Sequence, residues 1–561
     1  MRLSPSPIVL FTLALAATST VQAAEEAAVA EAKELMNRYE QTIVPLERAV
    51  NLCWWDANTT GSDAAFEAKQ AAQNAYDAAL ADRGRFETLK RLDAADLGDD
   101  LLARQIHLLY LLHLEKQIPA ELQQQLVAKS NAIEKAFNIY RATVDGVALA
   151  DSDVRKVLLE SKDPEYRRRV WLASKAVGTI VEKQFLELVA ARNQAAQELG
   201  FDNFHTMMLT LNEQEPEQID RIFDGLDDLT REPYEKVKEQ IDRELAAGYS
   251  ITPEDLYPWH YQDPFFQEPP RVASIDMDAP LAGADIPGVC RKFYAGIGLP
   301  IDDVLAASDL YEKPGKSPHA FCTDIDRRGD VRVLANIVPN DYWMSTMLHE
   351  LGHAVYSSVN IPAELPYIVR TDAHILATEG MAMMFERLCD SSDWLAAMGV
   401  EVADGEAYDR SAETMRRYKL LIFSRWCQVM YRFEKAMYAD PSQDLNRLWW
   451  DLVEEYQGVQ RPSERSSPDF ASKIHVISAP VYYHNYLLGQ LFASQLHATI
   501  TREVLGGGEP ATAVYWDQPE VGTFLQKRVF DLGRTRHWSE MVEVATGEPL
   551  SSEAFAAEFA E

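Results

Sequence analysis

The sequence predicts a mainly α-helical fold, and three observations support this prediction. From residue 24 to about Leu245, apolar residues recur at intervals of three and four, with few glycines or prolines between them. This is the period of an amphipathic helix. The chain beyond about Asp372 has the same pattern. Of the 561 residues, 47% are hydrophobic, so the helices can enclose a large core.

The first 23 residues have the features of an export signal. Arg2 precedes an apolar run from Ile8 to Ala17, and residues 21–23 provide a small-x-small cleavage site. The run is too short to cross a bilayer, and no later stretch offers about eighteen uncharged apolar residues. We therefore expect a signal peptide over residues 1–23 and a mature protein over 24–561. This mature protein would have no membrane anchor and would lie in a periplasm or outside the cell.

The net charge and the cysteines narrow the function further. A charge of −33 at pH 7 argues against nucleic acid and anionic membranes as partners, because both would repel the protein. The five cysteines are few for an exported chain of this length, and their odd number leaves at least one thiol unpaired. Cys290 and Cys322 flank one region of expected hairpin and loop and are the preferred pair, although spacing alone does not establish connectivity.

Between about Gly248 and Pro339, frequent prolines predict loops, short helices and a small sheet. The segments 319–324 and 331–337 have the composition of two strands, joined by a turn at residues 328–330. The aromatic segment 259–266 fits either a packed turn or the wall of a binding cleft.

The helical segment Thr346–Tyr356 contains the motif His-Glu-x-x-His. His349 and His353 are four residues apart, so they share one face of a helix and direct two imidazoles toward one point. Glu350 projects beside them, where it could take a proton from water, as in zinc hydrolases. The alternative is an amphipathic helix with two solvated histidines. Apolar neighbours favour a buried helix, in which these polar groups need a partner such as zinc.

Zinc bound by two histidines of one helix needs a third protein ligand from elsewhere, with water in the fourth position. Glu379 follows His353 by 26 residues, on the next expected helix of about Asp372–Leu388, and is the preferred candidate. Glu386 lies two turns further along the same face and could support a ligand from behind. The competing ligands are Glu364, Asp372, His374 and Glu386.

An ordered set of motifs in the C-terminal half carries a family resemblance. Trp449-Trp450 is followed by Tyr456-Gln457-Gly458, then by Lys473-x-His475, and finally by Tyr483-x-x-Tyr486. In this order, and with the zinc motif, the chain resembles the angiotensin-converting-enzyme family of zinc peptidyl-dipeptidases over most of its mature length. The last two motifs contain four side chains that can donate a proton, at positions 473, 475, 483 and 486. Packing at the start of a helix explains any one of them better than all four together.

The resemblance implies a role for each matching residue. Zinc would be bound by His349, His353 and Glu379, and Glu350 would activate water. His475 and Tyr486 would stabilise the oxyanion. The remaining residues would bind substrate, with Lys473, Tyr483 and Gln262 on its C-terminal carboxylate and His319 and Ala320 along its backbone.

The chain departs from the family pattern in several places. The family's third ligand comes about two residues sooner than Glu379, and Met383 stands where the family often has Asp. One chloride-binding Arg of the family falls at Asn485, whereas Arg465 matches the other, so chloride remains an open alternative. The stretch from Lys473 to Tyr483 is one residue longer than in the family.

Together these observations predict a mainly α-helical metallopeptidase of two lobes around a deep channel, with a small sheet beside the zinc helix. The expected activity is removal of dipeptides from the C-termini of short peptides, with one Zn²⁺. Two alternatives remain open. The first is a thimet-like oligopeptidase, which cuts internal bonds; the second is a non-catalytic peptide-binding protein on the same scaffold, against which the base Glu350 argues.

Overall fold

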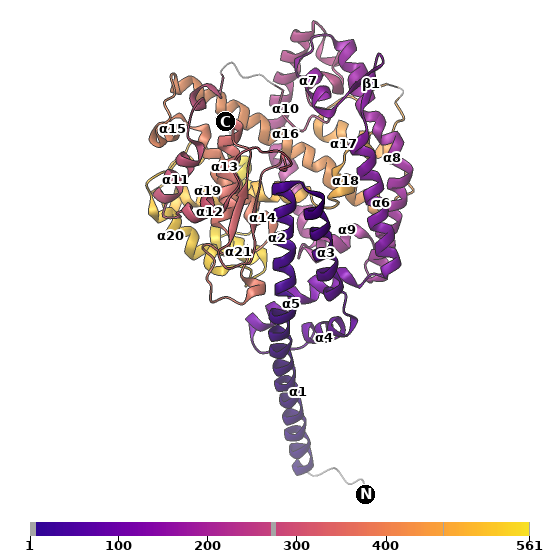
Figure 1. The fold of residues 1–561 in the computed structure, drawn as a ribbon, viewed down its shortest axis with the longest axis vertical. Helices are drawn as coiled ribbons and strands as arrows, with labels where there is room; N and C mark the ends of the chain where they lie inside the picture. The colour runs from indigo at the N-terminus through magenta and orange to yellow at the C-terminus, as the bar shows by residue number, and fades with distance from the viewer. Residues whose placement is uncertain (1–6, 271–275, 464, 560–561) are drawn as a thin grey trace.

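The computed structural model describes residues 7–270, 276–463 and 465–559 and confirms the predicted mainly helical fold. Figure 1 shows two groups of helices, with the N-terminal helix projecting from them. The described residues contain two small antiparallel sheets, each of two strands. None of the described helices combines the length and the apolar character that a membrane crossing requires.

The N-terminal helices form a layer with a small core of their own. Leu89 and Ile106 pack there with Tyr367 and Ile368 from the region after the zinc motif, so this layer is tied to the candidate site region. The predicted signal peptide falls partly outside the described residues, which begin at Pro7. The helices are α1 (Pro7–Thr42), α2 (Val44–Thr60), α3 (Asp63–Leu80), α4 (Arg83–Asp93) and α5 (Asp100–Leu114).

One group of helices lies on the right in Figure 1 and contains the chain from residue 120 to 249, joined by three later helices. Its elements are α6 (Ala120–Ile139), β1 (Ala142–Val144), β2 (Val147–Leu149), α7 (Asp151–Glu160), α8 (Pro164–Glu198), α9 (Phe204–Leu211), α10 (Pro216–Tyr249), α16 (Gly405–Ala439), α17 (Leu445–Gln457) and α18 (His475–Ser478).

The hairpin β1–β2 corrects the prediction of almost continuous helix from residue 24 to 245. Its turn is Asp145-Gly146, and both residues have a positive φ, of 52° and 81°. This conformation matches the twist of the flanking strands, and Asp-Gly is a recognised signal for it. The Asp-Gly turn signal is only two residues long, and the helical period of the surrounding sequence led us to predict helix through it.

The other group, on the left in Figure 1, contains the zinc motif. The strands β3 and β4 pair in antiparallel register, with Phe321 opposite Leu334, which confirms the predicted hairpin. The elements are α11 (Ile286–Gly296), α12 (Asp302–Ala307), β3 (Phe321–Asp324), β4 (Val331–Leu334), α13 (Asp341–Val355), α14 (Ile375–Glu386), α15 (Ser392–Met398), α19 (His484–Glu503), α20 (Pro519–Arg528), α21 (Trp538–Thr546) and α22 (Glu553–Ala557).

Small residues allow α13, α14 and α19 to approach closely. A Cβ atom on Gly352 of α13 would lie 2.7 Å from the Ala382 Cα of α14. A Cβ atom on Gly380 of α14 would lie 2.8 Å from the Gly489 carbonyl oxygen of α19. Both distances are shorter than van der Waals contact allows, so glycine is required at each crossing. This packing brings the zinc motif, Glu379 and Tyr486 to one region.

The predicted disulfide between Cys290 and Cys322 is wrong. All five cysteines are free thiols, with Cys290 buried in α11 and Cys322 half-buried in β3. The continuous apolar core around α11 supplies the stability for which a smaller exported domain would need a crosslink.

Candidate metal centre

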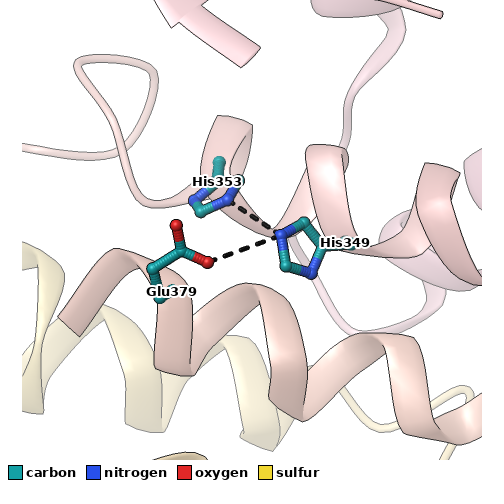
Figure 2. A group of neighbouring side chains, drawn as sticks. All are labelled: His349, His353 and Glu379. Carbon is teal, nitrogen blue, oxygen red and sulfur yellow. Dashed lines mark hydrogen bonds and ion pairs between the residues drawn. The ribbon is translucent and has the colours of Figure 1, made fainter. Parts of the chain in front are cut away.

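His349 and His353 lie one helical turn apart on α13, and their Nε2 atoms are 3.2 Å apart. Asn340 caps this helix by accepting a hydrogen bond from the Trp343 amide. Glu379 reaches the pair from α14, with its Oε2 3.6 Å from the His349 Nε2 (Figure 2). Ligand atoms of the three side chains all lie within 4.8 Å of one another.

Two contacts orient the histidines. The His349 Nδ1 lies 2.7 Å from Glu386 Oε2, and the His353 Nδ1 lies 2.7 Å from Thr378 Oγ1. Because Glu386 as a carboxylate can only accept, it keeps a proton on the Nδ1 of His349 and leaves Nε2 as the atom that can bind a metal. The Nε2 atoms of the two histidines face the same point, so a proton or a metal cation has to lie between them.

The spacing of the group fits a zinc ion. Zn–N bonds of about 2.0–2.1 Å in tetrahedral geometry place two nitrogen ligands roughly 3.3 Å apart. The observed separations are 3.2 Å between the His349 and His353 Nε2 atoms and 3.6 Å between the His349 Nε2 and Glu379 Oε2. Two imidazoles and one carboxylate, with room for a fourth ligand, form the donor set of a catalytic zinc site.

The charges around the group favour a cation. Burial alone would lower the pKa of His349, but its hydrogen bond to Glu386 and the charges of Glu386, Glu350 and Glu379 raise it to about 9. Burial, opposed by the charge of His349, raises the pKa of Glu350 to about 7. The rise at His349 comes from three surrounding carboxyl groups, and a divalent cation would neutralise the negative charge that they concentrate there.

The structure also places the residues that competed with Glu379 as ligand. Glu364 is exposed, and His374 instead caps α14 and bonds to the Asn212 carbonyl at 2.9 Å. Asp372 lines the same cavity as the centre but is not part of the three-residue group. Glu386 lies behind His349. This is the supporting position that the sequence suggested for it.

A cavity of about 490 Å³ opens onto the centre. Its walls include Glu350, which is only 8% exposed, and Tyr486 from α19. Residues 320–324, which contain Ala320 and strand β3, form another wall. His319 is exposed and is not among the residues that line this cavity.

Lys473 and His475 line a second cavity, of about 300 Å³. Tyr483 connects them to the metal cavity, because its ring centre lies 5.3 Å from that of His475 and 5.6 Å from that of Tyr486. Burial, together with the charge of Lys473, lowers the pKa of His475 to about 4, so its imidazole is neutral at pH 7. The structure thus brings Tyr486 to the metal cavity and places His475 one aromatic ring away.

Lys473 is a buried cation in an aromatic environment. Its Nζ donates to Gln267 Oε1 at 2.5 Å and lies about 5 Å from the rings of Phe265 and Trp426. Burial lowers the pKa of its ammonium group to about 8, although the charge of Asp263 opposes the change. A buried ammonium with one neutral partner can form a strong hydrogen bond to a ligand carboxylate.

The glutamine beside Lys473 and Tyr483 is Gln267, not the predicted Gln262. Gln267 Oε1 also lies 3.5 Å from the Tyr483 hydroxyl, whereas the Gln262 side chain interacts with Tyr249. The segment 259–266 is a packed turn, in which Gln262 has a φ of 67° and Asp263 accepts the amide of Gln267 at 3.0 Å. Its residues 263–265 also line the second cavity, so both alternatives for this segment apply. Because the chain reverses in this turn, Gln267 and not Gln262 reaches Lys473. The spacing of residues in the sequence does not indicate such a reversal.

The two positions connected with chloride are occupied by internal contacts. Arg465 forms a two-point ion pair with Asp469, with contacts of 2.7 and 2.6 Å. Asn485 is buried and accepts a hydrogen bond from Gln214 at 2.7 Å. Because the charge of Arg465 is already neutralised by a carboxylate, a chloride ion there would have to compete with it.

Comparison with known proteins identifies the family. The model of the peptidase M2 family, described as angiotensin-converting enzyme, matches residues 26–260 and 289–560. The angiotensin-converting enzyme of Haematobia irritans exigua is 24% identical over 493 residues, which cover 79% of each protein. The angiotensin-converting enzyme of Oryctolagus cuniculus is 23% identical over 464 residues, covering 76% of this chain but only 34% of that protein.

The chain therefore spans about a third of the length of the rabbit relative, and a match to the Rattus norvegicus enzyme covers 20% of that protein. The family model, by contrast, covers both helical groups, and the zinc motif lies within its second matched range, residues 289–560. Because this model matches most of the sequence, the chain belongs to the peptidase M2 family, the angiotensin-converting-enzyme family of metallopeptidases.

Proposed function

We propose that this protein is a zinc peptidyl-dipeptidase, which releases dipeptides from the C-termini of short peptides. The main support is the convergence of His349, His353 and Glu379 on one point, beside the buried Glu350 and within one cavity. Binding of a peptide alone would not need a carboxyl group next to two metal-binding histidines. A catalytic role accounts for Glu350.

His349, His353 and Glu379 would hold the zinc ion, which when bound polarises a carbonyl group and makes water more acidic. Glu350 would take the proton from the attacking water and pass it toward the leaving amine. Tyr486, in the same cavity, would donate a hydrogen bond to the oxyanion of the tetrahedral intermediate. His475 is neutral and would support this donation from the side of Tyr483.

Lys473 would provide the specificity for a free C-terminus. With Gln267 and Tyr483 it forms a buried group of hydrogen-bonding side chains around one point. An ammonium at a fixed place in the cleft selects substrates by the distance between their carboxylate and the scissile bond. This would limit cleavage to a fixed number of residues from the end.

The substrate backbone would lie along strand β3. This strand pairs with β4 on one side, and no other described strand pairs with its second edge. An extended peptide can add to such an edge through main-chain hydrogen bonds. Ala320 precedes the strand and lines the metal cavity, so it would contact the peptide near the cleavage site, with the exposed His319 further out.

The proposal is tested with pairs of peptides that differ only in a free or amidated C-terminus. Lys473→Ala should lower kcat/KM for the free peptide by roughly ten- to a hundredfold, because a charge-assisted hydrogen bond contributes about 1.5–3 kcal/mol. The amidated peptide lacks this contact already and should lose little. Gln267→Ala should reduce the preference for the free terminus, and Gln262→Ala should not.

Equal losses for both peptides would contradict the peptidyl-dipeptidase assignment. Cleavage of amidated peptides at internal bonds by the unmodified enzyme would favour a thimet-like oligopeptidase instead. The products are identified by mass spectrometry, since dipeptide release is visible directly in the fragment masses. If the protein holds one zinc ion per chain and binds peptides but does not cleave them, it is a non-catalytic peptide-binding protein on the same scaffold.

Export of the protein is part of the same proposal. The expected signal peptide, residues 1–23, would direct the chain to a periplasm or out of the cell, where short peptides are its substrates. N-terminal sequencing of the protein from its producing cells should give Ala24 as the first residue. An intact Met1 on the active protein would show that the segment is not removed.

A further inference from the structure

The turn between α18 and α19 contains a strained backbone conformation. Val481 has a φ of 54°, in the left-handed region, and its side chain is buried. A β-branched residue avoids this region because its side chain clashes with the neighbouring backbone. Within residues 7–270, 276–463 and 465–559, no other β-branched residue has a positive φ. Such conformations persist only where surrounding contacts maintain them, and they are frequent at functional sites.

Glu434 of the neighbouring helix α16 contacts this turn. Its Oε1 atom accepts a hydrogen bond from the Val481 amide at 2.9 Å. Glu434 is only 2% exposed, and burial raises the pKa of its carboxyl group to about 8 against the opposing charge of Arg192. A carboxyl group buried in this way carries a desolvation penalty that packing alone does not require. A leucine would fill a similar volume without the penalty, so the hydrogen bond to the turn is the distinctive contribution of Glu434.

Arg192 of α8 holds the preceding part of the same segment. Its Nη1 donates to the Val476 carbonyl at 3.1 Å, and its Nη2 donates to the Ile477 carbonyl at 2.5 Å. The same guanidinium donates to the Tyr438 hydroxyl at 3.0 Å, which anchors it to α16. Two buried side chains from two different helices therefore fix the backbone between residues 476 and 481.

This segment joins the residues of the two cavities. His475 begins it, and Tyr483 and Tyr486 follow it within five residues of Val481. The three rings form a continuous row, with centre separations of 5.3 Å and 5.6 Å. The conformation at Val481 therefore decides how far His475 lies from Tyr486.

We propose that Glu434 and Arg192 are positioning residues, which hold the turn at Val481 and thereby align His475 and Tyr483 with Tyr486. Neither residue lines the metal cavity, so each acts through the segment that it holds. This inference rests on the proposed function, because that function assigns His475 and Tyr486 to the reaction.

The test compares Glu434→Ala with Glu434→Gln. Alanine removes the acceptor of the Val481 amide, and turnover should fall by about tenfold or more, because displacement of a reacting group by about 1 Å can cost a hundredfold. Glutamine keeps an acceptor oxygen of the same reach and should restore kcat to within about threefold of the unmodified enzyme. Zinc content should stay stoichiometric in both variants, since the ligands belong to α13 and α14.

Gln428→Ala is the matched control. Gln428 lies on the same helix, is 1% exposed and donates to the Phe223 carbonyl at 2.6 Å, away from the turn. Its loss should lower the melting temperature but leave kcat unchanged. Equal kcat for Glu434→Ala and Gln428→Ala would show that Glu434 only stabilises the fold, and the inference would be wrong.

Val481→Gly provides an independent test, because glycine adopts a positive φ without strain. In this variant the turn no longer depends on Glu434, so adding Glu434→Ala should lower kcat by less than about threefold, because the effects of two residues that act through one contact do not add. If Glu434→Ala alone does not fold but the double variant folds and turns over, the inference also holds. If neither folds, or if the losses in kcat multiply, Glu434 does not act through the turn.

Failure of the proposed function would look different. Tyr486→Phe and His475→Ala would then retain normal kcat, and no variant of the turn could affect the reaction through them. If these two variants lose activity while Glu434→Ala keeps it, the proposed function stands and only the positioning role is wrong.

Discussion

In the proposed mechanism, burial would suit Glu350 to act as a general base at neutral pH. A carboxyl group with a pKa of about 7 takes up a proton readily, while one of ordinary pKa is a weaker base. We expect Glu350→Gln to lower kcat by at least about a hundredfold, since general-base catalysis contributes 10²–10⁴-fold. The metal should remain, because Glu350 does not belong to the His349, His353 and Glu379 group. Loss of zinc from this variant, measured by atomic absorption, would show that Glu350 has a structural role instead.

Lys473 should make the preference for a free C-terminus depend on pH. Burial lowers the pKa of its ammonium to about 8, so the group is charged below this pH and neutral above it. The ratio of kcat/KM for free and amidated peptides should therefore fall roughly tenfold between pH 8 and 9.5, because kcat/KM follows the ionisation of the free enzyme. In Lys473→Arg the charge persists to much higher pH, and the ratio should stay level. A level ratio in the unmodified enzyme would contradict the assignment.

At the scale of elements, the crossing of α14 and α19 determines the position of Glu379. A Cβ atom on Gly489 would lie 2.8 Å from the Cβ of Glu379 and 3.3 Å from the Gly380 amide nitrogen. Gly489→Ala should therefore separate the helices and lower the free energy of unfolding by about 1–3 kcal/mol, as overpacking does. It should also weaken zinc binding, which titration against a chelator measures.

Gly248→Ala is the matched control for this substitution. Gly248 lies near the end of α10, and an added Cβ there would meet no atom within 4 Å. Alanine should raise the free energy of unfolding by about 0.4–1 kcal/mol because it restricts the unfolded chain. Zinc affinity should not change. Similar effects of the two substitutions on zinc would show that the crossing does not position the ligand.

For the whole molecule, the metal should connect α13 and α14 and thereby stabilise the group of helices that contains them. Removal of zinc by a chelator should lower the melting temperature, and zinc at a thousand times its dissociation constant should restore about 4 kcal/mol of unfolding free energy. Calorimetry with and without zinc measures this change. His349→Ala should show no such response, since it lacks one of the three ligands. An equal response in that variant would place the stabilising metal elsewhere.

The helical fold and the placing of His349 and His353 on one helix face were predictable because their signals are local. The period of apolar residues predicts helices, and the spacing of four places His349 and His353 on one face of α13. The hairpin β3–β4 was predicted in the same way from two apolar segments around a turn. The hairpin β1–β2 was missed, although Asp145-Gly146 was a readable signal for its turn.

The sequence by itself determined the helices, the histidine pair and the family, because each depends on spacing within one element or on motif order along the chain. Only the tertiary structure decided that Gln267 rather than Gln262 contacts Lys473, that Arg465 is neutralised by Asp469, and that no cysteine pairs. The contact of Glu434 with Val481 joins α16 to a turn 47 residues later in the sequence. Such contacts depend on how helices pack and where turns reverse the chain, and neither of these produces a periodic pattern of residues in the sequence.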